Sequence, residues 1–215
     1  MKRRLPLILF TSMLILLPSV VSGLYFWDAL PDPMATHFGF DNAPNGYSSK
    51  AFTVFGIPAL MTALHLLCIW VTSKDRGNQG KNSKIQSLLL WLIPIISLFT
   101  TWVIYSANLN PDLDVTTPMM LLFAIVFLLA GNWMPKVRKN YIIGIRLPWT
   151  LSASGEEWDK THRFAGRVWV ACSLILLVDA FAGIARNWVL LGSLVVISAV
   201  PIVYSYFVCR KDTGN

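Results

Sequence analysis

Six long apolar blocks constrain this chain more than any other feature of its sequence. They cover residues 5–26, 51–73, 85–107, 117–131, 165–184 and 189–208. Runs of roughly 18 or more apolar residues are typical of transmembrane helices. Only 13% of the residues are charged, against about 25% in soluble domains. We therefore predict an all-α, polytopic transmembrane helix bundle with six spans, forming a single domain over residues 1–215.

The first block is interpreted as a retained helix. A cleaved signal peptide is the alternative, with Val21, Ser22 and Gly23 as a cleavage site. The apolar region of a signal peptide usually runs for about 7–15 residues, whereas this block continues to Trp27 without a break.

The basic residues are distributed unevenly among the loops between the blocks. With a cytoplasmic N-terminus, sixteen of the 18 Lys and Arg residues fall on the cytoplasmic side, and only Lys50 and Arg186 fall outside. Because Lys and Arg concentrate in cytoplasmic loops, we predict that both termini are cytoplasmic. This placement explains the net charge of +7 without nucleic-acid binding, since such residues set topology and contact anionic lipids. The outer loops instead carry Asp28, Asp32, Asp41, Asp112 and Asp114.

The segment 131–169, called the signature segment below, holds seven of the 18 basic residues and four of the nine Trp. A solvent loop does not need so many aromatic rings, and a transmembrane helix does not tolerate so many charges. Trp and basic side chains are both favourable at a membrane interface. We therefore predict that the segment lies in the cytoplasmic interface between the fourth and fifth spans.

A capping box predicts that a helix begins inside this segment. Glu157 follows Ser154 by three residues, the spacing at which each side chain caps the other's backbone N–H. The helix is expected to run into the fifth span, with Trp158 and His162 on one face. Spacing of i,i+4 also predicts two ion pairs, Glu156 with Lys160 and Asp159 with Arg163.

Two residues predict a turn before that helix. Pro148 favours extended backbone at Leu147, and Gly144 permits a tight turn within Tyr141–Arg146. Such a hairpin has two interpretations. It either serves only to tie the fourth span to the fifth, or it presents a surface to a partner.

Two ionisable residues lie within the apolar blocks. A carboxylate in a bilayer is costly and marks a functional site by default. Asp179 therefore either pairs with Arg186 or a neighbouring helix near the outer interface, or serves a toxin, ion or proton site. His65 is expected to be a hydrogen-bonded interior residue, and Cys68, Cys172 and Cys209 are expected to be buried thiols.

The outer loop, residues 27–50, carries the turn signals Asp32-Pro33, Ala43-Pro44 and Asn45-Gly46. His37 and Asp41 could hold a metal, but the loop has no second His and no HExxH motif, so we predict none. The alternative is a lid folded on its own aromatic residues Phe38, Phe40 and Tyr47. Motifs for nucleotide or acyl chemistry are absent, which predicts neither an enzyme nor a cofactor.

Gly131-Asn132, the run from Asn140 to Leu151 and the run from Trp158 to Phe164 together resemble the signature of the SdpI family. The outer loop from Leu30 to Lys50 resembles the N-terminal segment that often accompanies it. The resemblance spans most of the chain.

The resemblance implies an integral membrane immunity protein of the bacterial cytoplasmic membrane that protects against a secreted, membrane-active peptide toxin. It also implies signalling, in which a small ArsR-like repressor is held at the membrane. The expected toxin-facing candidates are His37, Phe38, Asp41, Tyr47 and Asp179. The expected cytoplasmic readout candidates are Asn132, Asn140, Gly144, Arg146, Pro148, Trp149, Thr150, Trp158, His162 and Arg163.

A small proton- or ion-coupled transporter is the alternative function. It requires a polar path through the bilayer, for which Asp179, His65 and Asn132 are the candidates, and these lie on different helices at different depths. An enzyme acting on lipid or peptide would need a paired acid and base or a nucleophile set, which the sequence does not offer.

Overall fold

The computed structural model describes residues 5–39, 41–74 and 83–210. Six of its helices are long and apolar enough to cross a membrane, which confirms the predicted six-span, all-α class. The long helices are α1 (Leu5–Tyr25), α2 (Ile57–Lys74), α3 (Ser83–Leu109), α4 (Thr116–Trp133), α6 (Gly155–Ala182) and α7 (Arg186–Arg210). The short elements are β1 (Met34–Phe38), β2 (Pro44–Ser48), η2 (Phe52–Gly56), η4 (Met134–Lys136) and α5 (Pro148–Ser152).

The chain divides into two compact units. The first comprises residues 1–73 and 86–118, and the second comprises residues 74–85 and 119–215. Several of the basic residues behind the predicted topology, including Lys2, Arg3 and Arg4, lie outside the described residues, as does Phe40 of the predicted lid.

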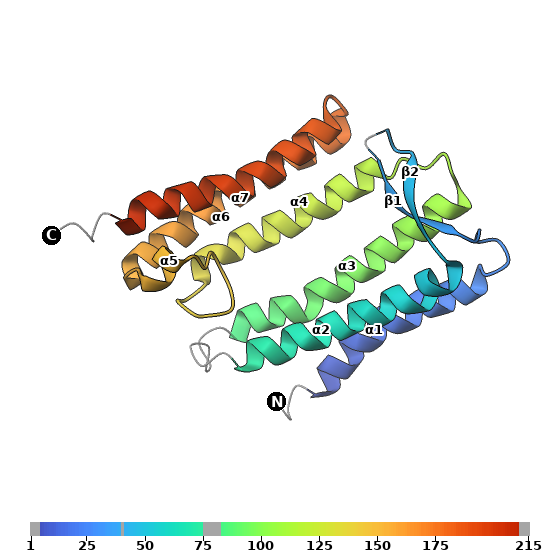
Figure 1. The fold of residues 1–215 in the computed structure, drawn as a ribbon, viewed down its shortest axis with the longest axis horizontal. Helices are drawn as coiled ribbons and strands as arrows, with labels where there is room; N and C mark the ends of the chain where they lie inside the picture. Colours follow the sequence, from blue (N-terminus) through green and yellow to red (C-terminus); the bar gives the residue numbers. More distant parts are fainter. Residues whose placement is uncertain (1–4, 40, 75–82, 211–215) are drawn as a thin grey trace. The chain divides into compact units, whose positions relative to one another are not determined.

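In the first unit, α1, α2 and α3 lie side by side (Figure 1). Hydrogen bonds from polar side chains join α1 to α2 and to α3. His65 of α2 is fully buried, and its Nε2 lies 2.9 Å from Thr11 Oγ1 of α1, which confirms the predicted interior role. Tyr105 of α3 donates its hydroxyl to the carbonyl of Ser19 at 3.0 Å. Such bonds matter in a bilayer, where no water competes for the polar atoms.

The outer loop contains an antiparallel hairpin, β1–β2, which the turn signals did not predict. Asn45 and Gly46 lie inside β2, so their assignment to a turn was wrong. The chain reverses instead around Asn42, which has a φ of 63°. Asn42 donates its side-chain amide to the carbonyl of Leu113 and accepts from the N–H of Val115, at 2.9 Å each. These long-range bonds fix the position of the turn. The intrinsic preference of Asn for the left-handed conformation is too weak to do so alone.

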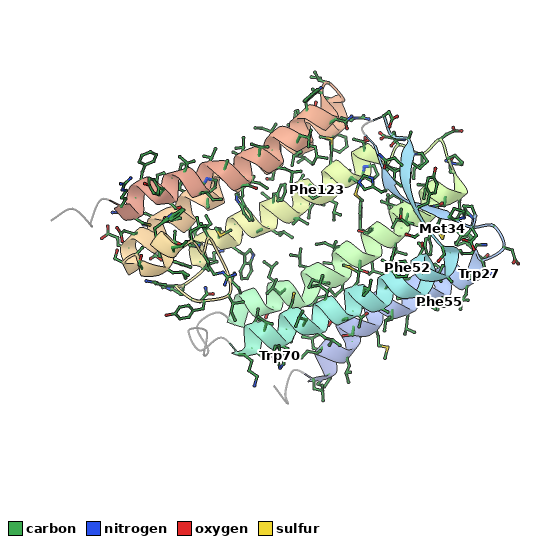
Figure 2. The ribbon with its side chains drawn as sticks, in the orientation of Figure 1. Trp27, Met34, Phe52, Phe55, Trp70 and Phe123 are labelled. Carbon is green, nitrogen blue, oxygen red and sulfur yellow. The ribbon has the colours of Figure 1, made fainter. Side chains whose placement is uncertain are left out.

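The hairpin rests on a small apolar core at one end of the first unit. Met34 and Val54 are fully buried there, with Leu30, Ile104 and Tyr105 around them. Figure 2 shows Trp27, Phe52 and Phe55 beside Met34 at this end, whereas Trp70 lies toward the other end of α2. Ser49 Oγ accepts from the N–H of Phe52 at 3.3 Å, at the start of the second span.

The second unit is built on apolar contacts among α4, α6 and α7. Its core consists of Met120, Ala124, Phe127, Cys172, Leu176, Ala180 and Ile197. Pro201 lies inside α7 and has no N–H to donate to the carbonyl of Ile197, four residues earlier. The indole N–H of Trp169 on α6 donates to that carbonyl instead, at 3.0 Å. A neighbouring helix thus satisfies the group that the proline leaves free.

Replacing Trp169 by Phe should destabilise the protein by about 0.5–2 kcal/mol, because the Ile197 carbonyl loses its donor while the apolar packing is largely kept. Unfolding of the purified protein in mixed detergent measures this change. Trp188→Phe is the matched control, since Trp188 is 78% exposed. The loss of stability caused by Trp169→Phe should be smaller in a Pro201→Ala background, because that substitution restores a backbone N–H for the carbonyl of Ile197. An equal loss in both backgrounds would contradict the role assigned to Trp169.

Candidate functional site

The signature segment forms an ordered clamp in the second unit. After α4 and η4, residues 137–147 form a loop, α5 follows, and α6 begins at Gly155. Ser154 Oγ accepts from the N–H of Glu157 at 3.3 Å, and Glu157 Oε2 accepts from the N–H of Ser154 at 2.6 Å. The predicted capping box is therefore confirmed. One continuous helix then runs from Gly155 to Ala182.

Two side chains on one face of α6 hold the two ends of the loop. Trp158 and His162 are both fully buried, and their rings stack with centroids 4.1 Å apart. The indole N–H of Trp158 donates to the carbonyl of Val137 at 2.8 Å, where the loop starts. His162 Nε2 accepts from the N–H of Ile145 at 3.0 Å, where the loop ends. The i,i+4 pair expected from the sequence is thus the centre of the clamp.

The contacts of His162 specify its tautomer. Its Nδ1 lies 2.8 Å from the carbonyl of Trp158, which can only accept, so Nδ1 carries the proton. Its Nε2 faces the Ile145 N–H and therefore acts as the acceptor. Both ring nitrogens of a neutral imidazole are used. A second proton on Nε2 would place two donors against each other and would release the loop.

Gly144 allows the loop to lie directly against this pair. Its φ is +107°, a conformation that other residues rarely adopt, and a Cβ at this position would lie 2.3 Å from His162 Nε2. The predicted tight turn at Gly144 is confirmed, with a reason the sequence did not show: the backbone packs on a buried imidazole.

Asn140 holds the middle of the loop and is only 2% exposed. Its side-chain amide donates to the carbonyls of Arg138 and Ile143, at 2.7 and 3.0 Å. Its Oδ1 accepts from the N–H groups of Ile142 and Ile143, at 2.8 and 2.6 Å. One buried side chain therefore supplies hydrogen-bond partners for four backbone groups that lie outside any helix or sheet.

The helix α5 ties the loop to α7. Leu147 is extended, with φ −110° and ψ 159°, as Pro148 predicted. Thr150 Oγ1 accepts from the N–H of Leu147 and lies 2.8 Å from the carbonyl of Ile145, to which it donates. The indole N–H of Trp149 donates to Ser205 Oγ of α7 at 2.9 Å.

Two glycines next to the clamp, Gly131 and Gly166, approach each other closely, which the sequence did not predict. A Cβ on Gly131 would lie 2.9 Å from the carbonyl of Gly166, and one on Gly166 would lie 2.6 Å from the carbonyl of Gly131. The end of α4 and the start of the α6 span therefore meet backbone to backbone. Their wide separation in sequence hides this pairing, which is typical of small residues at helix contacts in membranes.

The surface of the clamp is basic. Lys136, Arg138, Lys139, Arg146 and Arg163 are exposed, as is Tyr141. Arg146 donates to the carbonyl of Tyr141, and Lys139 donates to the carbonyl of Ala153. Glu156 pairs with Lys160 at 2.7 Å as predicted; the described residues contain no such pair between Asp159 and Arg163.

The readout candidates therefore divide into two groups. Asn140, Thr150, Trp158 and His162 are buried and shape the loop, with Gly144, while Asn132, Arg146, Pro148 and Arg163 are exposed. Trp149 is partly exposed at the contact with α7. Only the exposed residues are accessible to a partner, whereas His162 is buried and contacts the loop backbone at Ile145.

Asp179 lies in the second unit and caps the turn between α6 and α7. It is 6% exposed, and its Oδ1 accepts from the N–H groups of Ile184 and Ala185 at 3.0 and 3.2 Å. A carboxylate at these N–H groups is favourable because they immediately precede the N-terminus of α7, where negative charge is stabilised. The apolar block predicted that the last span starts at Val189, but α7 starts three residues earlier, at Arg186. The capping by Asp179 accounts for the earlier start.

The other toxin-facing candidates lie on the hairpin of the first unit. His37, Asp41 and Tyr47 are exposed and Phe38 is partly exposed. His37 Nδ1 donates to the side-chain oxygen of Asn45, and Asp41 Oδ1 accepts from the N–H of Ala43. In the described part of the chain, no three His, Cys, Asp or Glu side chains are grouped so as to hold a metal ion.

Comparison with known proteins relates both units to known sequence families. Residues 136–205 match the SdpI/YfhL protein family, and residues 13–62 match a domain of unknown function, DUF1648. The chain is 26% identical over 208 residues to "Immunity protein SdpI" of Bacillus subtilis (strain 168), covering 95% of this chain and 97% of that protein. No solved structure matches the chain significantly.

Replacing Gly144 by Ala should open the clamp, since the new Cβ clashes with His162 and the backbone conformation is strained by roughly 1–3 kcal/mol. The expected result is faster trypsin cleavage within residues 137–147, measured on the full-length protein in detergent. Gly155→Ala is the matched control, because a Cβ there meets no atom within 4 Å. Equal cleavage rates for the Gly144→Ala variant and the unmodified protein would refute the role of Gly144.

Proposed function

The chain belongs to the SdpI family, and on this premise we propose that it is an integral membrane immunity protein that protects its cell against a membrane-active peptide toxin. The observation that carries the proposal is the similarity to an immunity protein over 95% of this chain and 97% of that relative. Similarity along the whole length includes both the hairpin and the clamp.

The hairpin is the proposed site of contact with the toxin. The positive-inside rule supports an outer location for it, because the loop of residues 27–50 carries a single basic residue, Lys50. A secreted toxin meets the outer face first. The exposed side chains of His37, Asp41 and Tyr47 are available there.

The clamp is the proposed cytoplasmic readout surface, on which a small ArsR-like repressor would be held. Its exposed basic residues, among them Arg146 and Arg163, supply charge for docking. Its buried core of Trp158, His162 and Asn140 makes the surface rigid, which lowers the entropy cost of binding.

A small coupled transporter is the second function considered. Of its candidate polar residues, Asp179 serves as a turn cap through Oδ1, and His65 lies in the first unit beside Thr11. Asn132 is exposed. These roles favour structural explanations for the candidates, and we propose neither transport nor enzymatic activity.

Expression of the chain in a sensitive bacterium should raise survival when the cells meet at least one of a panel of membrane-active peptides. The reason is that an immunity protein acts at the membrane that the toxin attacks. Colony counts with and without expression measure the effect, and membrane fractions establish that the chain is inserted. Equal survival across the whole panel would defeat the immunity proposal.

Arg146→Ala should reduce signalling and leave insertion intact, because Arg146 is exposed on the clamp and its loss removes docking charge. A transcriptional reporter fused to the promoter of the chain's gene measures the response to the protective peptide. Lys160→Ala is the matched control, since it removes one basic charge whose exposed ion pair is worth little. Unchanged reporter output in the Arg146→Ala variant would count against the readout role.

A further inference from the structure

The two edges of the β1–β2 hairpin are treated differently by the fold. On the β1 edge, the N–H of Ala35 donates to Asn108 Oδ1 at 2.8 Å, and Asn108 Nδ2 donates to the carbonyl of Ala35 at 2.8 Å. The side-chain amide of Asn108 on α3 thus makes the two bonds to Ala35 that a third strand would make. The β1 edge is therefore occupied at Ala35.

The register of the hairpin shows where the other edge is open. Ala35 lies opposite Tyr47. Because Ala35 directs its N–H and carbonyl toward Asn108, the Ala35–Tyr47 pair is not hydrogen-bonded across the hairpin. The backbone N–H and carbonyl of Tyr47 therefore point away from β1. Neither group makes a backbone hydrogen bond to a described residue outside the hairpin, and Tyr47 is 57% exposed.

An open strand edge is a ready template for another strand. Here the edge is short, because Pro44 at its start has no N–H to offer. The Pro44 carbonyl also lies 3.4 Å from the hydroxyl of Tyr47. An added segment would therefore bond chiefly to the two free groups of Tyr47, with side-chain contacts supplying the remaining affinity.

The charges around the hairpin indicate what kind of peptide fits. The described loops at this end of the first unit carry five exposed Asp residues and one basic residue, Lys50. The acidic residues are Asp28, Asp32, Asp41, Asp112 and Asp114. Lys50 is already engaged, since its Nζ donates to the carbonyl of Trp27 at 2.9 Å. The surroundings therefore favour a cationic partner and disfavour the pairing of two copies of this chain, whose acidic loops would repel each other.

Apolar side chains lie close to this acidic surface. Trp27 and Phe55 lie with ring centroids 6.0 Å apart, and Phe52 and Phe55 are each more than 40% exposed. Figure 2 shows these three rings at the hairpin end of the unit. A peptide with alternating basic and apolar residues can place one set toward the Asp residues and the other toward the rings, because side chains alternate along a strand.

We propose that the outer edge of β2 at Tyr47 binds an extended cationic peptide by β-strand addition. The inference rests on the proposed immunity function and specifies how the toxin is recognised. The main-chain bonds supply affinity for any extended segment, and the acidic surroundings select basic ones. Sequence identity of the peptide matters less than its charge and its ability to extend.

The direct test uses a synthetic decapeptide of alternating Lys and Val, added to the full-length protein in phosphatidylcholine nanodiscs. Amide hydrogen exchange at Tyr47 should be fast in the free protein and slow with peptide, while the Ala35 amide stays protected throughout. The same peptide with N-methylated backbone amides, and an alternating Glu–Val peptide, should give no protection. No slowing at Tyr47, or equal slowing with either control peptide, would overturn the proposal.

Removal of the main-chain donor of Tyr47 provides a second readout. Tyr47→Pro should weaken peptide binding about three- to tenfold, while the Ala35 amide stays protected from exchange, which shows that the hairpin is still folded. A Tyr47 amide that is protected without peptide, increasingly so at higher protein concentration, would show that a second copy occupies the edge and would refute the inference.

The cellular experiment separates this inference from the function on which it rests. If cells with the unmodified chain survive the toxin and cells with Tyr47→Pro survive equally at equal membrane levels, strand addition fails and the immunity function stands. If cells with the unmodified chain are not protected, the immunity function fails first. Loss of protection by Tyr47→Pro alone supports both.

Discussion

Every backbone donor and acceptor in a bilayer needs a partner within the protein, and this requirement shapes the chain wherever a helix is interrupted. At Pro201 the carbonyl of Ile197 is satisfied by the indole of Trp169. Where α6 turns into α7, the first free N–H groups are satisfied by Asp179. The cost of an orphaned group in hydrocarbon explains why aromatic and carboxylate side chains are found inside otherwise apolar blocks.

The clamp applies the same requirement to a loop. Residues 137–147 have neither helix nor sheet to pair their backbone, so Asn140, Trp158 and His162 supply the partners. Because these side chains are buried, the loop they hold is rigid, and the exposed charges of Arg146 and Arg163 are carried on a defined surface. A rigid loop of this kind is consistent with the proposed readout role, because it lowers the entropy cost of docking.

The requirement does not apply to the hairpin, which lies outside the six spans. Asn108 satisfies the β1 edge, while Tyr47 keeps a free donor and acceptor at the β2 edge. A backbone donor or acceptor without a protein partner is tolerated where water can bond to it. Another chain can then replace the water and form the hydrogen bond. Under the proposed strand addition, the acidic and aromatic surroundings would favour a peptide that carries basic residues and an apolar face.

The amino-acid sequence by itself determined the six spans, the Ser154 cap at the start of α6, the extended Leu147 and the shared face of Trp158 and His162. These follow from local patterns: apolar runs, i,i+3 and i,i+4 spacing, and the restricted backbone before proline. Only the tertiary structure decided the rest. The Asn42 turn, the Asn108 cap, the Gly131–Gly166 contact and the loop bond to His162 join residues far apart in the chain. Local propensity cannot encode them, because their energies exist only once the helices are packed.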